Sequence, residues 1–294
     1  MTRLLWVFTL AASLPAAQAD AVSQYRRGME AYNRRDHPAA VKELSAFLAG
    51  PEGVEAQRRE AAAALGLSYH FLGEHARAVP LLEQASSYAP ENVEFSYALG
   101  LSQLRRNDTA GARKAFSRLF RVPAETAQAH LLTARFMIRE ELHPMAQKEL
   151  ERAAELQPDL PQLHYMLGEL AIFRGEFDRA IGELRREIQL NPGFSMAYYR
   201  LGDVFARKGH WKEAIAPLQQ AIWLNPDFSS PYVLLGKVYE QTGQATSAEA
   251  MLKRALAMDP NNAGARYLLG TVLRKAGREE EAREQFDAYR RLRK

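Results

Sequence analysis

The chain has 294 residues, of which 47% are hydrophobic and 25% charged, and a formal net charge of +4. This composition is typical of an ordered protein and excludes a disordered or collagen-like chain. The sequence contains no cysteine, which excludes disulfide bonds, thiolate metal sites, cysteine nucleophiles and a lipid-modified N-terminal cysteine. Acidic and basic residues are mixed along the chain, so we expect no nucleic-acid partner.

Residues 1–19 have the parts of an export signal. Arg3 gives a positive start, residues 4–14 form an uncharged apolar run, and Ala17-Gln18-Ala19 supplies the small residues that a signal peptidase requires. The uncharged stretch is shorter than the ~20 apolar residues that span a bilayer. We therefore predict a signal peptide over residues 1–19, cleaved after Ala19, and a periplasmic or secreted product with no membrane span. Retention of the segment as an anchor is the alternative.

The remainder of the chain repeats with a period of 34 residues. Prolines preceded by Asn, Asp or Gln recur at this spacing: Pro158, Pro192, Pro226 and Pro260. An alanine column has the same period: Ala78, Ala112, Ala146, Ala180, Ala214, Ala248 and Ala282, joined by Ala40 if four extra residues are allowed. Four residues later stands a large apolar column: Leu44, Leu82, Phe116, Leu150, Leu184, Leu218, Leu252 and Phe286.

A column of small residues occurs earlier in each unit: Gly28, Gly66, Gly100, Ala134, Gly168, Gly202, Gly236 and Gly270. Apolar residues recur at spacings of three and four, as in Tyr198, Leu201 and Phe205, which indicates two amphipathic helices per unit. The small columns let these helices approach closely while Leu or Phe fills the space beside them. A further column, Gly73, Asn107, Gly175, Gly209, Gly243 and Gly277, stands where the first helix should end in a left-handed residue.

This pattern resembles the tetratricopeptide repeat family over the whole predicted mature chain. The unit that contains Tyr198, Leu201, Gly202, Ala214 and Pro226 is the most similar to the family consensus. The resemblance implies an all-α fold, an α-solenoid of about eight helix-turn-helix repeats forming a right-handed superhelix. We place the repeats at residues 21–54, 59–92, 93–126, 127–160, 161–194, 195–228, 229–262 and 263–294. The first and fourth depart most, because Arg27 and Thr133 occupy a leucine column and Glu141 replaces the turn glycine.

No catalytic signature is found. The chain has no nucleophile elbow, Walker loop, dinucleotide-binding turn or paired-histidine metalloprotease helix. His70 and His75 are the nearest to a histidine pair, but five residues separate them across a predicted helix end, so they do not share a face as metal ligands would. We expect no enzyme activity, no cofactor and no metal.

In the resembled family the first helix of each unit lines the concave face of the solenoid. The resemblance therefore implies a partner-binding groove to which Met29 in the first unit also contributes. The candidate binding residues are Leu67, His70, Tyr97, Leu101, Arg135, Tyr165, Glu169, Tyr199, Asp203, Lys237 and Tyr267. Tyrosine offers amphipathic contact area of the kind favoured in interfaces. The alternative is that these tyrosines only pack between neighbouring first helices.

Family members that hold the acidic C-termini of cytosolic chaperones use a clamp of lysine, arginine and asparagine. The matching positions here carry Met29, Leu67 and Leu101, so a different ligand is expected. An extended segment or an amphipathic helix would suit a groove that is apolar in the early units and charged in the later ones. The leading hypothesis is a non-catalytic protein-interaction scaffold or adaptor of the cell envelope that binds a protein or peptide partner. Two alternatives remain, the recognition arm of a separately encoded enzyme such as a glycosyltransferase, and a carrier of a small apolar ligand.

Overall fold

The computed structural model describes residues 16–51 and 53–293, so most of the predicted signal peptide lies outside the described residues. The regular secondary structure of the described residues is entirely helical. The first eight helices are α1 (Ala16–Asn33), α2 (His37–Ala49), α3 (Glu55–Phe71), α4 (His75–Tyr88), α5 (Val93–Arg105), α6 (Thr109–Phe120), α7 (Ala127–Arg139) and α8 (His143–Leu156). The second eight are α9 (Leu163–Phe173), α10 (Phe177–Leu190), α11 (Ser195–Arg207), α12 (Trp211–Leu224), α13 (Ser229–Gln241), α14 (Ala245–Met258), α15 (Ala263–Lys275) and α16 (Glu279–Leu292). None of these helices, within the described ranges, is long and apolar enough to cross a membrane.

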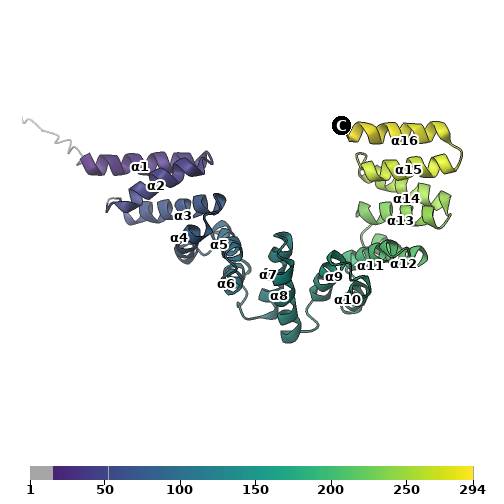
Figure 1. Ribbon diagram of the computed structural model, residues 1–294, viewed down its shortest axis with the longest axis horizontal. Coiled ribbons are helices and arrows are strands. Elements are labelled where there is room, and N and C mark those ends of the chain that lie inside the picture. Colours follow the sequence, from purple (N-terminus) through teal and green to yellow (C-terminus); the bar gives the residue numbers. More distant parts are fainter. Residues whose placement is uncertain (1–15, 52, 294) are drawn as a thin grey trace, which may run out of the picture. The chain divides into compact units, whose positions relative to one another are not determined.

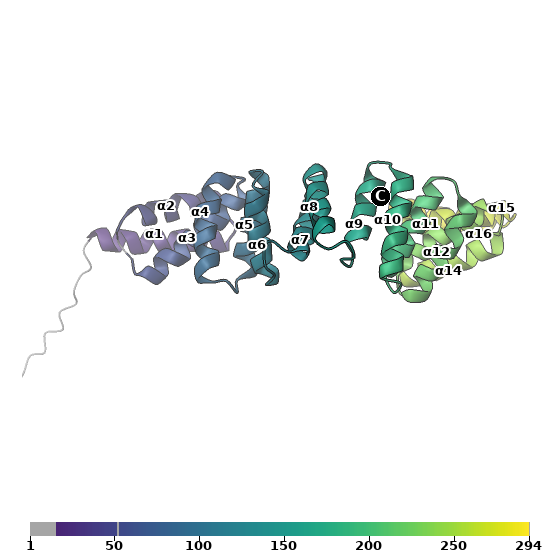
Figure 2. The same cartoon turned by 90° about the horizontal axis from the view of Figure 1, so that it is seen from below.

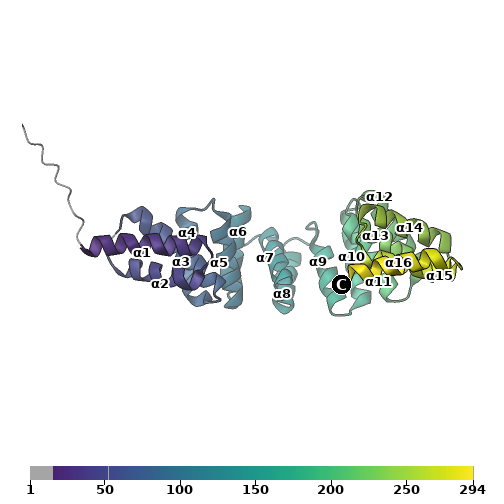
Figure 3. The same cartoon turned by 90° about the horizontal axis from the view of Figure 1, so that it is seen from above.

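The helices form two compact units, which we call unit 1 (Met1–Met145) and unit 2 (Ala146–Lys294). In unit 1, α1 to α6 follow one another as helical hairpins in chain order (Figure 1). In unit 2, α9 to α16 stack in the same way (Figure 2). At the end of unit 2, α15 and α16 lie side by side as the last hairpin (Figure 3). Each unit is therefore a stack of helix-turn-helix repeats, and together they establish the predicted α-solenoid class.

Left-handed residues end the first helix of the hairpins, as the glycine column predicts. Positive φ angles occur at Gly73, Asn107, Gly175, Gly209, Gly243 and Gly277. At the first of these, the Gly73 N–H donates to His70 O at 3.1 Å and the Glu74 N–H donates to Tyr69 O at 2.8 Å, which closes the helix end. Arg35 (φ 61°) and Glu141 (φ 60°) adopt the same conformation in the first and fourth hairpins although they carry a Cβ. The turn is thus kept where the sequence departs from glycine.

Small residues bring the two helices of a hairpin into close contact. A Cβ added to Gly202 would lie 2.6 Å from Leu218 Cγ, closer than real side chains pack. Every residue of the alanine column is at most 1% exposed, and the large column is fully buried from Leu44 to Leu252, whereas Phe286 is only partly buried. The predicted pairing of small with large residues is therefore the packing rule of each hairpin.

The two polar residues in the leucine column are accommodated in different ways. Arg27 on α1 is partly exposed and forms an ion pair of 2.8 Å with Glu43 on α2. Thr133 on α7 is fully buried, and its hydroxyl donates to Ala129 O at 2.8 Å within the same helix. Both polar groups are satisfied, so these departures do not interrupt the helices.

Candidate functional site

Unit 1 carries a groove on the face formed by its first helices, α1, α3 and α5, of which α3 contacts both of the others. The groove has a volume of about 740 Å³. We call it the unit 1 groove. Its lining consists of Met29, Tyr32, Asn33, Glu55, Ala56, Arg59, Glu60, Ala63, Ala64, Leu67, Tyr88, Asn92, Glu94 and Phe95. This is the size of a site that holds a small ligand or part of a peptide.

The floor of the unit 1 groove is apolar. Leu67, a predicted binding residue, is 2% exposed, and Ala63 and Ala64 beside it on α3 are also buried. Met29, Tyr32 and Phe95 are half-buried and pack against the core of unit 1. The floor is therefore held on the core of unit 1 by the repeat packing, and its half-buried members present an apolar surface to a ligand.

The rim of the groove is mainly acidic. Arg59 forms an ion pair of 2.8 Å with Glu55, and its guanidinium lies 5.6 Å from the centre of the Tyr88 ring. The Tyr25 hydroxyl donates to the Glu60 carboxylate, and burial together with this carboxylate raises the pKa of Tyr25 to about 12. Burial, followed by the charge of Glu94, also raises the pKa of Tyr32. The negative charge of Glu94 thus acts on Tyr32, a residue of the groove floor.

Glu60 and Glu94 are not among the binding residues predicted from the sequence. Glu60 stands seven residues before Leu67 and Glu94 seven residues before Leu101, so each lies two helical turns away on the same face as a predicted residue. The same helical register that predicts Leu67 and Leu101 therefore also predicts the two carboxylates, if it is extended two turns towards the N-terminus of each helix.

His70 lies outside the unit 1 groove, in a small polar cluster. Its Nδ1 lies 2.8 Å from Ser102 Oγ, and Nδ1 of His75 lies 3.4 Å from the same atom. The two rings, which the sequence spacing placed on different faces, lie with their centres 5.8 Å apart, and Ser102 of α5 is within hydrogen-bond distance of both. Burial lowers the pKa of both histidines. Ser102 is 0% exposed, so this serine cannot act as a nucleophile on a substrate.

The other predicted residues of unit 1 are placed separately. Tyr97 packs on Phe136 of α7 with ring centres 5.8 Å apart, and its hydroxyl accepts a hydrogen bond from Arg139. Leu101 is half-buried on α5 and Arg135 is exposed on α7. Among the described residues no group of three or more His, Asp or Glu side chains is placed to hold a metal ion.

The predicted acidic residues of unit 2, Glu169 and Asp203, are paired with arginines on α11. Arg200 on α11 binds Glu169 on α9 through two contacts, Nε–Oε1 at 2.8 Å and Nη2–Oε2 at 3.0 Å. Asp203 lies 3.0 Å from Arg207 and 3.9 Å from Arg200. Burial raises the pKa of Glu169, and Arg200 opposes that shift. These side chains link neighbouring repeats and leave little uncompensated charge for a ligand.

Two of the predicted tyrosines of unit 2, Tyr165 and Tyr199, pack against the next repeat. Tyr165 meets Phe194 edge to face at 5.1 Å, and Tyr199 meets Phe228 in the same way at 5.1 Å. In both pairs the phenylalanine precedes the first helix of the next repeat. Both rings therefore have a packing role between neighbouring repeats.

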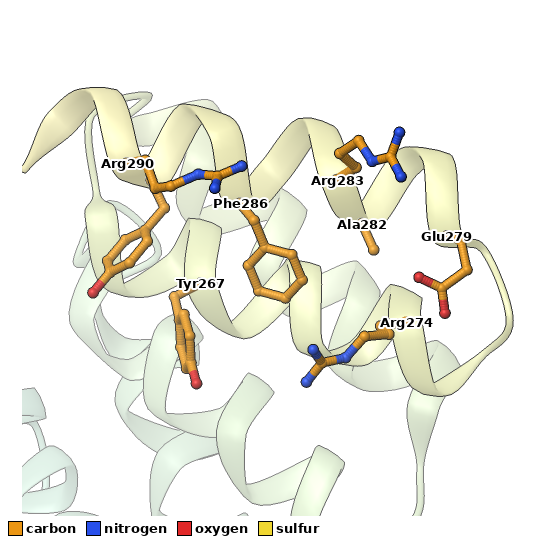
Figure 4. Close-up of a pocket in the computed structure, with 8 residues that line it drawn as sticks. Tyr267, Arg274, Glu279, Ala282, Arg283, Phe286 and Arg290 are labelled. Atoms are coloured by element: carbon orange, nitrogen blue, oxygen red, sulfur yellow. The ribbon is translucent and has the colours of Figure 1, made fainter.

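Two small pockets hold the remaining predicted residues. Tyr199, Asp203 and Lys237 line one of about 270 Å³ on the first-helix face of unit 2. Tyr267 lines another, of about 400 Å³, between α15 and α16, where it faces Phe286 and where Arg274 and Arg290 stand at the edge (Figure 4). The predicted residues therefore occupy several separate places, and Leu67 is the member that lies in the largest first-helix groove described above.

The repeat architecture agrees with comparisons to known proteins. The tetratricopeptide repeat model matches residues 63–125, 97–161, 138–193, 165–228 and 233–294. The chain therefore belongs to the tetratricopeptide repeat family. No curated protein sequence matches the chain.

Solved structures of similar fold include MamA and YrrB. MamA residues 41 to the end from Desulfovibrio magneticus RS-1 is 23% identical, with a TM-score of 0.53, and the match covers 57% of this chain and 94% of that one. YrrB, described as a TPR protein with an unusual peptide-binding site, is 20% identical, with a TM-score of 0.53, and the match covers 62% of this chain and 93% of YrrB. At this identity the likeness shows the fold.

Proposed function

We propose that the chain is a protein-interaction scaffold whose unit 1 groove binds a peptide segment of a partner protein. The observation that carries the proposal is the groove of about 740 Å³ with its apolar floor on the first-helix face. Family membership supports a binding role, and the peptide-binding site named for YrrB is a precedent on the same fold. Helix faces held by repeat packing give such a surface without a large ordering cost on binding.

The groove is tested by removing its half-buried floor. The double variant Met29→Ala, Phe95→Ala should lose crosslinks between α1, α3 or α5 and the partner when the envelope fraction is analysed by crosslinking mass spectrometry. The matched control is Val233→Ala, Leu234→Ala, which trims two half-buried residues of the unit 2 pocket and should keep the crosslinks. If crosslinks persist in the first variant and vanish in the control, the binding surface lies in unit 2 and the proposal is contradicted.

We further propose that the scaffold acts in the cell envelope after export. The support is the sequence of residues 1–19, with its positive start, apolar run and Ala17-Gln18-Ala19. N-terminal sequencing of the protein expressed in a bacterial host and released from the periplasm should begin at Asp20. A protein that keeps Met1 and sediments with the membrane would contradict cleavage.

A further inference from the structure

The charges of the unit 1 groove indicate what kind of segment it selects. We propose that its ligand is a cationic segment, in which an apolar side chain that fills the floor is flanked by lysine or arginine. This inference rests on the proposed function and specifies the partner of the same groove. The floor of the groove binds the apolar side chain, and the rim selects the positive charge.

The floor determines the apolar part of the ligand. Met29, Tyr32 and Phe95 surround Leu67, so the ligand meets side chains from three first helices. Methionine and aromatic rings adapt to differently shaped apolar groups. An apolar residue seated here removes its surface from water, which supplies affinity with little preference for charge.

The rim determines the charge of the ligand. Three carboxylates, Glu55, Glu60 and Glu94, and one guanidinium, that of Arg59, line the groove, which gives a formal charge of −2. Arg59 is already engaged by Glu55 and by the Tyr88 ring. Glu60 accepts a hydrogen bond from the Tyr25 hydroxyl, and a hydroxyl does not neutralise a carboxylate. Cations are therefore attracted to this rim and anions are repelled.

Asn92 adds a contact suited to a peptide backbone. Its side-chain oxygen accepts a hydrogen bond of 3.0 Å from the Glu94 N–H at the start of α5. That bond does not use the side-chain NH₂ group, which has two hydrogen-bond donors. A carbonyl oxygen of a bound segment is a suitable acceptor next to the acidic rim.

Unit 2 offers no equivalent charge. On its first-helix face Arg200 binds Glu169, and Arg207 binds Asp203. The acidic residues of this face are thus paired with arginines, and Lys237 adds a positive charge there, whereas the rim in unit 1 keeps two carboxylates without a cationic partner among the groove residues. We therefore assign the preference for a cationic segment to unit 1.

The test compares three fluorescein-labelled peptides by fluorescence anisotropy on the chain from residue 20 onward. All three have about twelve residues and the same leucine and phenylalanine positions, and the intervening positions are lysine in the first, serine in the second and glutamate in the third. The lysine peptide should bind about tenfold more tightly than the serine peptide, and the glutamate peptide should bind most weakly. Raising the salt from about 0.05 M to about 0.5 M should reduce the difference, because rim charges are exposed and screened.

The double variant Glu60→Gln, Glu94→Gln should remove the preference, so that the lysine peptide binds no more tightly than the serine peptide. Glu30→Gln is the matched control, an exposed carboxylate on α1 outside the groove lining. Circular dichroism spectra of both variants should match that of the parent chain. Equal binding of all three peptides, or a preference that survives the double variant, would overturn the inference while leaving the proposed function intact. If none of the three peptides binds, both the inference and the proposed function fail.

Discussion

The first-helix faces of the two units use charge for different purposes. In unit 2 the charged residues form ion pairs between α9 and α11 and within α11. In unit 1 two carboxylates at the groove rim, Glu60 and Glu94, have no cationic partner among the groove residues. The comparison teaches that one repeat framework can place charge either to join its repeats or to select a ligand. Which of the two applies depends on whether an opposite charge stands within reach, on the same first helix or on the neighbouring one.

The largest effect should come from crowding a hairpin, and it should differ between a tightly packed hairpin of unit 1 and a looser one of unit 2. A Cβ at Gly100 in unit 1 would lie 2.4 Å from Phe116 Cε1, whereas a Cβ at Gly168 in unit 2 would lie 3.0 Å from Leu184 Cγ. Gly100→Ala should lower the free energy of unfolding by about 3 kcal/mol, because a buried aromatic ring must shift. Gly168→Ala should change it by less than about 1 kcal/mol, because the gain in helix propensity offsets the milder contact. Urea denaturation of the two variants checks the order, and an equal loss would contradict it.

Breaking the ion pair of unit 2 should affect stability and leave binding unchanged. Arg200→Ala removes both contacts to Glu169, whose carboxylate is largely buried. The expected loss is about 2 kcal/mol in the free energy of unfolding, the cost of leaving a buried charged group without its partner. Urea denaturation measures this loss, and anisotropy with the lysine peptide should give the parent affinity. A tenfold weaker affinity without a loss of stability would show that this network binds the ligand.

A smaller effect is expected at the turn between α7 and α8. Glu141 has a φ of 60°, whereas Gly175 holds the corresponding turn of unit 2 at a φ of 74°. Glu141→Gly should raise the free energy of unfolding by roughly 0.5–1 kcal/mol, since it removes the left-handed strain but gives the unfolded chain more freedom. The reciprocal change Gly175→Glu should lower it. Thermal unfolding of both variants is the measurement, and the changes in the free energy of unfolding should have opposite signs.

The smallest effect should be a pH dependence of opposite sign in the two units. Burial lowers the pKa of His70 and His75 in unit 1, so their stabilising contribution is present above pH 6.5 and is lost as the pH falls through the lowered values. The hydrogen bond to Glu183 raises the pKa of His164 in unit 2. Its contribution is present below pH 6.5 and is lost as the pH rises through the raised value.

Acidification from about pH 8 to about pH 5.5 spans the ordinary histidine pKa. It should therefore weaken protection from hydrogen exchange in α3 and α5 and strengthen it in α9 and α10. The variants His75→Gln and His164→Gln provide the controls, each reducing the dependence in its own unit. A change of the same sign in both units would contradict the assignment.

The fold could be predicted from the sequence because its determinants are local and periodic. The Gly and Ala columns and the turn glycines recur every 34 residues, and each has one physical task that the structure confirms. The turn at Glu141 shows the limit, since the sequence marked it as an irregularity although its backbone keeps the left-handed conformation. There the helices on both sides determine the turn more strongly than the residue does.

The site could be predicted only in part. Leu67 was found from its register, whereas Glu60 and Glu94 were not, because only one or two positions of each first helix were considered. At Glu94, in the first turn of α5, a carboxylate is also what the helix dipole favours. The pairing of Glu169 with Arg200 depends on two helices 31 residues apart in sequence, and the placement of Tyr165 against Phe194 depends on the loop between repeats. Contacts between repeats determine which side chains remain available to bind a ligand. The 34-residue period of the sequence does not reveal these contacts.

The most direct test of the central claim is hydrogen–deuterium exchange of the full chain with and without the lysine peptide. If unit 1 holds the ligand and unit 2 uses its charges for packing, the peptide should slow exchange in α1, α3 and the start of α5. Exchange in α11 and α13 should be unchanged. Slower exchange in α11 and α13, with none in the helices of unit 1, would contradict the account.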